Sequence, residues 1–278
     1  MSTARKIMIK EMSVSDKQKA SLDTLKHLRD FCEENHIRYY LAYGTLLGTV
    51  RHKGFIPWDD DVDVWIPRPD YERFLSEYNN EMGNYKLVTC FLDKEYHLPY
   101  SKLDHGQTAR LNKDGSIDKR GIGIDIFPLD GLPQDVKYAS IVFEKQNNKF
   151  LKVINKLNTY AQLPTDSVIN VMKFLVGRIA KTTGFVNRMT RQIAVKQYVE
   201  EYDECEMIAC VTGVHSGKYI PFEKEWFNSK KLEFEGELFN CPCAYDKVLK
   251  KIYGDYMTPP PERDRQTTHT ELFVWRQY

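Results

Sequence analysis

The densest group of chemically active side chains is a run of aspartates in Ile56-Pro-Trp-Asp-Asp-Asp-Val-Asp-Val64. Carboxylates this close repel one another unless a positive charge lies among them. In a β-strand, residues two apart point to the same side with a separation of about 7 Å, so Asp61 and Asp63 can converge on one point. Mg²⁺ is commonly held by one or two carboxylates together with substrate phosphates. The pattern therefore predicts an Mg²⁺ (or Mn²⁺) site at Asp61 and Asp63; the alternative, a solvated acidic turn, is disfavoured by the apolar residues on either side.

Two further motifs could complete such a site. Gly44-Thr-Leu-Leu-Gly48 follows a predicted strand and opens a predicted helix. Glycine allows close approach of a ligand, and a helix N-terminus favours an anion, although a Gly-Thr pair is more often only a helix cap. Asp125 is the single charge in the apolar strand Gly121-Ile-Gly-Ile-Asp-Ile-Phe-Pro128. A buried carboxylate needs a cation, which is either a metal ion or a lysine or arginine.

The three pieces together resemble the active site of the nucleotidyltransferase superfamily, which displaces groups at phosphorus with the help of a metal ion. The segment from Tyr43 to Asp63 is similar to the defining motif of the LicD family, and Gly-Ile-Asp-Ile-Phe-Pro around Asp125 matches a second motif of that family. Phe234-Glu-Gly236 and the segment Tyr253-Gly-Asp-Tyr-Met257 resemble its C-terminal pattern. The resemblance is weakest between residues 135 and 205.

The resemblance implies a metal-dependent phosphotransferase that moves an alcohol phosphate from a CDP-activated donor to a hydroxyl of a glycan, with release of CMP. The relatives include bacterial phosphocholine transferases and fukutin-type ribitol-phosphate transferases. Phosphocholine from CDP-choline is therefore the leading expectation, with CDP-ribitol or CDP-glycerol as alternatives. The expected acceptor is a glycan or lipid-linked glycan of teichoic acid, lipopolysaccharide or capsule. Asp61 and Asp63 should hold the metal ion, and Asp125 should act as a third ligand or as the general base.

The resemblance also implies residues for substrate binding, of which Lys102 and Arg110 are the weaker candidates: Gly44, Thr45, Arg51, His52, Lys53, Trp58, Lys102, Arg110 and His269. Each has a simpler explanation. Arg51 could only pair with Asp59 or Asp60, Lys102 could be a solvated strand residue, and Trp58 could anchor the core. His269 could lie in a surface tail.

Three other functions are compatible with parts of the pattern. A nucleotide-sugar glycosyltransferase also uses an Asp-X-Asp pair, but it would leave the Gly-Thr element and Asp125 without roles, and it would release a nucleoside diphosphate. A nucleotidyltransferase acting on a small molecule would release pyrophosphate. A binding module without catalysis is disfavoured because all three aspartates are present.

The arrangement of predicted elements indicates an α/β (α+β) fold with a nucleotidyltransferase-like mixed sheet, flanking helices and a helical insertion. We expect a catalytic core over residues 1–134, a helical insertion over 135–205 that could bind the acceptor, and C-terminal strands and a helix over 206–278. The expected helices are a first one capped by Ser15, then 45–50, 69–82, several over 135–203 with a break near 162–165, and 244–253. The expected strands are 37–43, 61–66, 85–91, 98–103, 121–127, 207–211 and 231–239.

Charge and hydropathy exclude several classes of protein. The 278 residues are 42% hydrophobic with a net charge of +1, which is ordinary for a globular protein and gives no long-range field for nucleic acid. The N-terminal residues predict neither a signal peptide nor an anchor. Residues 168–186 are the most apolar helical stretch, but three basic residues in it argue against a spanning helix and leave a helix on the membrane surface compatible. We therefore expect a cytoplasmic protein, in peripheral contact with the inner face of the membrane if the acceptor is lipid-linked, with its six cysteines reduced.

Overall fold

The computed structural model describes residues 11–112, 115–133, 135, 148–195, 201–212, 220–265 and 271–276. It is a mixed α/β structure, which confirms the predicted class. Its helices are α1 (Val14–Glu34), α2 (Tyr43–His52), α3 (Arg68–Glu77), α5 (Asn148–Tyr160), α6 (Val168–Thr182), α7 (Phe185–Ala194), η3 (Lys224–Phe227), α8 (Tyr245–Tyr253) and η4 (Glu262–Asp264). Its strands are β1 (Tyr40–Leu41), β2 (Asp63–Pro67), β3 (Glu81–Met82), β4 (Tyr85–Val88), β5 (Ser101–His105), β6 (Thr108–Leu111), β7 (Gly123–Leu132), β8 (Met207–Ala209), β9 (Phe222–Glu223), β10 (Ser229–Phe234), β11 (Glu237–Pro242) and β12 (Leu272–Trp275).

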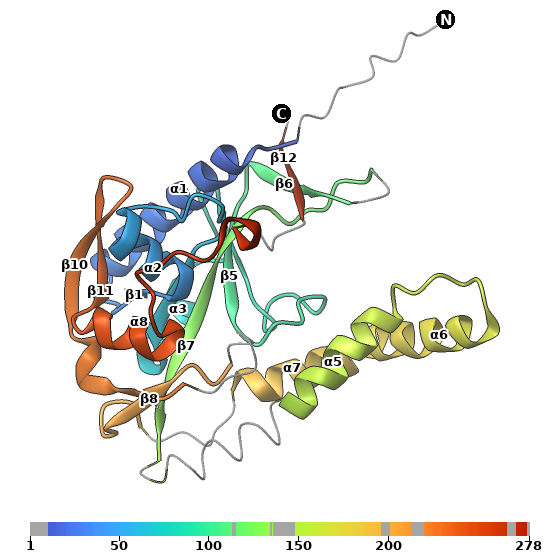
Figure 1. Cartoon of the computed structure of the whole chain (residues 1–278). Coiled ribbons are helices and arrows are strands. Elements are labelled where there is room, and N and C mark those ends of the chain that lie inside the picture. The colour runs from blue at the N-terminus through green and yellow to red at the C-terminus, as the bar shows by residue number, and fades with distance from the viewer. Residues whose placement is uncertain are drawn as a thin grey trace, which may run out of the picture.

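The central sheet has the strand order β1-β2-β7-β5-β4-β3, and β8 and β9 extend it from the far end of β7. Strands β2 and β7 are parallel, whereas β5 runs antiparallel to β7. Figure 1 shows β7 as the long strand that runs through the molecule and around which the other elements gather. Because β2, β7 and β5 are neighbours, residues at matching positions on these strands lie side by side.

Helix α1 packs against the middle of this sheet through a buried face that includes Leu25, Leu28 and Phe31. Its N-cap is Ser13, whose side-chain oxygen accepts a hydrogen bond from the Asp16 N–H, while the Asp16 carboxylate accepts from the Ser13 N–H. The prediction of Ser15 as the cap was therefore wrong by two residues. Asp16 decides the position, because it closes the reciprocal pair of bonds with Ser13.

Between residues 37 and 67, the strands and the helix begin and end at other residues than the sequence predicts. Strand β1 has two residues, and α2 begins at Tyr43, so Gly44 lies in the first turn of the helix. Strand β2 begins at Asp63, so Asp61 belongs to the preceding loop and not to the strand, contrary to the prediction. The start of β2 is fixed by bonds to the segment around α2: the Asp63 N–H donates to Thr45 Oγ1 at 2.8 Å, and the Ala42 N–H donates to the Asp63 carbonyl at 2.9 Å.

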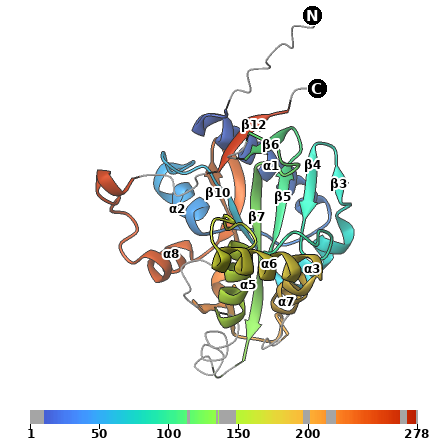
Figure 2. The same ribbon diagram turned by 90° about the vertical axis from the view of Figure 1, so that its right-hand side faces the viewer.

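The helical region agrees with the expected break, because α5 ends at Tyr160 and α6 begins at Val168. Helices α5, α6 and α7 share a small core of their own, which includes Leu151, Ile154 and Val186. Figure 1 shows them as an arm that extends sideways from the sheet, and in the view of Figure 2 this arm points toward the reader. Among the described residues, no helix is both long and apolar enough to cross a bilayer.

Four strands were missing from the sequence prediction, namely the two-residue strands β3 and β9 and the longer strands β6 and β12. The tail segment β12 pairs with β6 in an antiparallel ladder, with Phe273 opposite Arg110. Both strands are four residues long and rich in charged neighbours, so neither carries a clear alternating pattern. Their pairing returns the C-terminal segment to the side of α1 and β5.

Candidate active site

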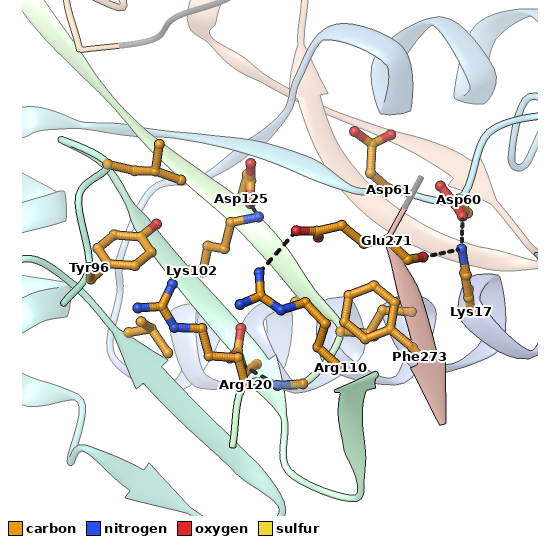
Figure 3. A pocket seen from close by; sticks show the side chains of 16 residues that line it. Lys17, Asp60, Asp61, Tyr96, Lys102, Arg110, Arg120, Asp125, Glu271 and Phe273 are labelled. Carbon is orange, nitrogen blue, oxygen red and sulfur yellow. Dashed lines mark hydrogen bonds and ion pairs between the residues drawn. The ribbon is translucent and has the colours of Figure 1, made fainter. Parts of the chain in front are cut away.

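One row of side chains crosses the three central strands. Asp63 on β2 is the register partner of Asp125 on β7, and Asp125 is the register partner of Lys102 on β5. Directly paired residues of neighbouring strands share a face of the sheet, with Cβ atoms about 4.5–5.5 Å apart. The Lys102 ammonium lies 2.6 Å from Asp125 Oδ1. Figure 3 shows the Lys102 side chain pointing toward Asp125. The sheet thus places two of the three predicted catalytic aspartates and one predicted substrate-binding lysine in contact range.

The loop that carries the remaining aspartates is fixed by α1. Lys17 Nζ pairs with Asp60 Oδ2 at 2.9 Å, and both side chains are buried. Gln18 Nε2 donates to the Asp59 carbonyl at 2.8 Å. These contacts anchor the two residues that directly precede Asp61.

Gly44 is needed where α2 meets this loop. A β-carbon added at Gly44 would lie 3.1 Å from Asp59 Oδ2, which is tighter than an ordinary contact. Thr45 is buried, and its hydroxyl oxygen accepts the Asp63 N–H. The Gly-Thr pair therefore brings α2 against the carboxylates and holds the start of β2 in place.

The negative charge of the clustered aspartates is only partly neutralised by nearby basic side chains. Burial, together with repulsion from Asp61 and Asp125, raises the pKa of Asp63 well above its usual range. Burial and the charge of Asp61 raise the pKa of Asp59 to about 8. Burial also raises the pKa of Asp125, against the opposing effect of Lys102. Groups in this condition gain from any cation or hydrogen-bond donor that enters the site.

A pocket of about 230 Å³ opens beside the row, and Figure 3 shows the side chains around it. Asp61 and Asp125 lie on one side of it, and Lys102, Arg110 and Arg120 contribute positive charge. Its other lining residues include Lys17, Asp60, Tyr96, Asp104, Glu271 and Phe273. Carboxylates and basic groups around one cavity are suited to a ligand that carries phosphate oxygens and a bound cation.

The two arginines of the pocket are held in different ways. Arg110 pairs with Asp118 at 2.5 Å and with Glu271 at 3.1 Å, so the C-terminal segment fixes its guanidinium. Arg120 lies 3.6 Å from Asp93 and stacks over Tyr96, with its guanidinium carbon 5.5 Å from the ring centre. Arg120 has the looser ion pair and can therefore turn toward a ligand at lower cost.

A second set of side chains approaches the carboxylates from α8 and the tail. Burial, and then the charges of Asp63, Asp59 and Asp61, raise the pKa of Tyr253 on α8. The guanidinium of Arg265 lies over Trp58, with 5.5 Å between the guanidinium carbon and the ring centre.

The basic cluster at the end of α2 lies outside the pocket described above. Arg51 donates to the Tyr256 carbonyl at 3.0 Å and to His52 Nε2 at 2.9 Å, and these contacts replace the pairing with Asp59 or Asp60 that was considered as an alternative. Burial and the nearby Arg265 lower the pKa of Arg51. Lys53 is exposed and ends the helix in a left-handed conformation, with φ of 57°. His269 lies outside the described residues, so its role stays a prediction.

Sequence reasoning missed four residues that the structure brings to the site: Lys17, Arg120, Tyr253 and Glu271. Lys17 lies within a predicted amphipathic helix, where a lysine is expected to be exposed to solvent. Tyr253 was seen only as part of a terminal motif. Arg120 reaches the pocket because its carbonyl accepts from the Arg110 N–H of β6, and Glu271 reaches it through the pairing of β6 with β12. Neither contact can be recognised from spacing in the sequence.

The negative charge of the site favours a metal ion, although the described side chains do not form a complete set of metal ligands. The oxygen donors of Asp61, Asp63 and Asp125 are those that a hard divalent cation prefers. In the part of the chain that the structure describes, however, no three His, Cys, Asp or Glu side chains are arranged as a metal site. The repulsion described above and the single compensating ammonium of Lys102 are what favour a cation here.

Comparison with known proteins agrees with this geometry. Residues 36–165, which include every residue of the row, match the family model described as "LicD/FKTN/FKRP, nucleotidyltransferase domain". The lipopolysaccharide cholinephosphotransferase LicD of Haemophilus influenzae is 29% identical over 95% of this chain and 98% of its own length. The ribitol 5-phosphate transferase FKRP of Homo sapiens is 28% identical over 34% of this chain and 20% of its own length. The chain is therefore similar to the LicD family over almost its whole length, and residues 36–165 match the nucleotidyltransferase domain of that family.

Proposed function

We propose that this protein transfers an alcohol phosphate from a CDP-activated donor to a hydroxyl of a cell-surface glycan and releases CMP. The observation that carries the proposal is the pocket in which Asp61 and Asp125 face Lys102, Arg110 and Arg120. The near full-length similarity to a lipopolysaccharide cholinephosphotransferase supports a phosphotransferase, and it favours phosphocholine as the transferred group. The acceptor would be lipopolysaccharide or another glycan of the cell envelope.

In the proposed reaction, an acceptor hydroxyl attacks the phosphorus that carries the alcohol. The new oxygen–phosphorus bond forms while the bond to the oxygen of CMP breaks, and the hydroxyl proton passes to a base. Lys102, Arg110 and Arg120 would hold the phosphate oxygens, whose charge is spread during such a displacement. Lys102 can leave Asp125 for a phosphate oxygen without crossing the pocket, because both residues line it.

A divalent cation is part of the proposal. Asp61 and Asp63 would hold it, and it would offset the phosphate charge. Asp125 has two available roles, as third ligand or as acceptor of the hydroxyl proton. The variant Asp125→Asn separates the two roles, with Mg²⁺ or Mn²⁺ binding measured by calorimetry. If turnover is lost and metal binding is retained, Asp125 is the base. If both are lost, Asp125 is a metal ligand.

The test is CMP release from a panel of CDP-choline, CDP-ribitol, CDP-glycerol and CDP-ethanolamine, with Mg²⁺, with Mn²⁺ and with a chelator. We expect metal-dependent release from one donor, at a slow rate without acceptor because water replaces the glycan hydroxyl. Asp61→Ala is the matched control, since it removes a carboxylate that lines the pocket and is only half-buried.

Donor binding provides a second readout that needs no acceptor. The correct CDP-alcohol should raise the melting temperature of the wild-type protein and leave that of Asp61→Ala unchanged. Neither release nor stabilisation by any CDP-alcohol, together with release of a nucleoside diphosphate from a nucleotide sugar, would instead establish a glycosyltransferase.

A further inference from the structure

Helix α6 exposes an apolar stripe that no described part of the chain covers. Six of its large aliphatic side chains are exposed, each by at least half: Val168, Ile169, Met172, Leu175, Val176 and Ile179. At 100° per residue, these positions fall within a sector of about 120° on one side of the helix. The opposite side, with Gly177 and Ala180, packs against α5. The stripe is therefore a surface feature and not part of the small core of the arm.

Charge around the stripe has one sign. Residues 148–195 contain eight lysines and arginines and a single acidic residue, Asp166, which gives the arm a net charge of +7. The rest of the chain carries −6, since the total is +1. Lys173 and Arg178 flank the stripe on its two sides at helical spacing, and α6 contains no acidic residue.

We infer that the α6 stripe is a docking surface for an anionic lipid bilayer, on which the helix lies parallel to the membrane plane. Interfacial helices bury an aliphatic face among the acyl chains and place lysine and arginine at the level of the head groups. A protein partner fits less well. Hot spots of protein interfaces are rich in tryptophan, tyrosine and arginine, whereas this stripe is wholly aliphatic and lies on one convex helix.

The arm is attached to the catalytic region firmly enough to position it at a surface. In α7, Asn187 Nδ2 donates to the Cys90 carbonyl at 2.9 Å, and Arg191 donates to the carbonyls of Cys90 and Phe91 at 3.0 and 2.9 Å. Arg68 NH1 donates to the Ala194 carbonyl at 3.2 Å. A bilayer under α6 would therefore lie at a fixed position relative to the pocket.

The inference is tested by co-sedimentation of the full chain with phosphatidylcholine vesicles, with and without phosphatidylglycerol, in the absence of nucleotide and acceptor. We expect binding only to the anionic vesicles, weakened by salt. Leu175→Glu should lower the partition coefficient at least ~tenfold, because it places a charge where an aliphatic side chain enters the bilayer. Leu238→Glu is the matched control, since Leu238 is equally exposed but lies on β11, and it should bind as the wild type does.

Charge is tested separately with Arg178→Glu and with its matched control Lys19→Glu, which alters an exposed residue of α1 by the same charge. Arg178→Glu should weaken binding about five- to tenfold or more, and Lys19→Glu much less. Equal binding by Leu175→Glu and wild type would overturn the inference. So would a wild-type dimer that ignores vesicles and becomes monomeric in Leu175→Glu, because the stripe would then join two copies of the chain. Unchanged melting temperatures of the variants show that the folds are intact, and because no nucleotide is present, the result does not depend on the reaction proposed above.

Discussion

Strand β7 carries two aspartates, and their surroundings differ in an instructive way. Asp130 is 1% exposed and is gripped by Arg68, whose Nε and NH2 lie 2.5 and 3.0 Å from its two carboxylate oxygens. Asp125, five residues earlier, meets one lysine and shares its space with Asp61 and Asp63. The first carboxylate is neutralised within the fold, whereas the second stands in a surplus of negative charge beside an open pocket.

The difference separates structural charge from functional charge. A bidentate arginine pair satisfies both oxygens and leaves little for a ligand to add. A carboxylate row with one ammonium is a destabilising feature, which the fold tolerates because the surrounding strands and α1 fix it. Substitutions at the two ends of β7 should therefore affect different properties.

The largest effect is expected at the carboxylate row. Asp63→Asn should reduce CMP release by at least about 10²–10³-fold, because it removes a charge that the displacement at phosphorus needs. Its melting temperature should stay equal or rise, since repulsion with Asp61 and Asp125 is relieved. Activity assays and calorimetry on the same preparation check both parts. Full activity, or a large loss of stability, would show that Asp63 is a structural residue like Asp130.

The opposite result is expected at the other end of the strand. Arg68→Met should lower the free energy of unfolding by about 3–5 kcal/mol, because it leaves Asp130 buried without its cation. Denaturant unfolding measures this loss. The double variant Arg68→Met/Asp130→Leu should regain much of the stability. A loss of less than ~1 kcal/mol in the free energy of unfolding of Arg68→Met would show that Asp130 does not need its buried cation.

Lys102→Met should give an intermediate phenotype. It removes the partner of Asp125 in a pocket that water can enter, so the expected loss of stability is only about 1 kcal/mol. The KM for the CDP-alcohol should rise about tenfold, since a charge-assisted contact with phosphate is lost. Lys102→Arg keeps the charge and should recover part of the affinity. An unchanged KM in Lys102→Met would show that Lys102 only pairs with Asp125 and does not bind the phosphate.

The smallest effect on the reaction is expected from Thr45→Val. The buried Asp63 N–H would lose its acceptor, at a cost of about 1–3 kcal/mol in stability. Turnover should fall several-fold through displacement of Asp63, and Thr45→Ser should behave as the wild type because it keeps the oxygen. A Thr45→Val protein with normal stability and lower affinity for the donor would instead indicate direct contact between the Thr45 hydroxyl and phosphate.

The sequence was most informative where chemistry and local pattern coincide. The aspartate run, the Gly-Thr pair and the lone Asp125 were each recognisable, and the structure brings them together because β2 and β7 are parallel neighbours. Helix α1 and the break between α5 and α6 followed from periodicity and from Pro164. None of the six cysteines, all of which the structure describes, takes part in a disulfide, and Cys243 is the exposed one among them.

What could not be predicted depends on contacts between distant segments. Asp61 leaves the strand because Thr45 and Ala42 bond to Asp63, which local propensity does not encode. Arg120 joins the pocket through the fold of β6, and Glu271 through the pairing of β12 with it. An ion pair of Asp125 with a lysine or arginine was considered only as an alternative, and Lys102 was not identified as the partner because the register between β5 and β7 cannot be read from either strand alone.

The pairing of β12 with β6 also has a consequence for how the protein matures. Glu271 supplies its carboxylate to Arg110 and its carbonyl oxygen to Lys17, at 3.1 and 3.2 Å, so one wall of the pocket comes from a segment that is synthesised after every other described part of the chain. The sheet with its repelling carboxylates can form before residue 271 has been synthesised, but the complete pocket cannot. A chain that stalls before residue 271 would carry the aspartate row without the carboxylate that pairs with Arg110 and the carbonyl that accepts from Lys17.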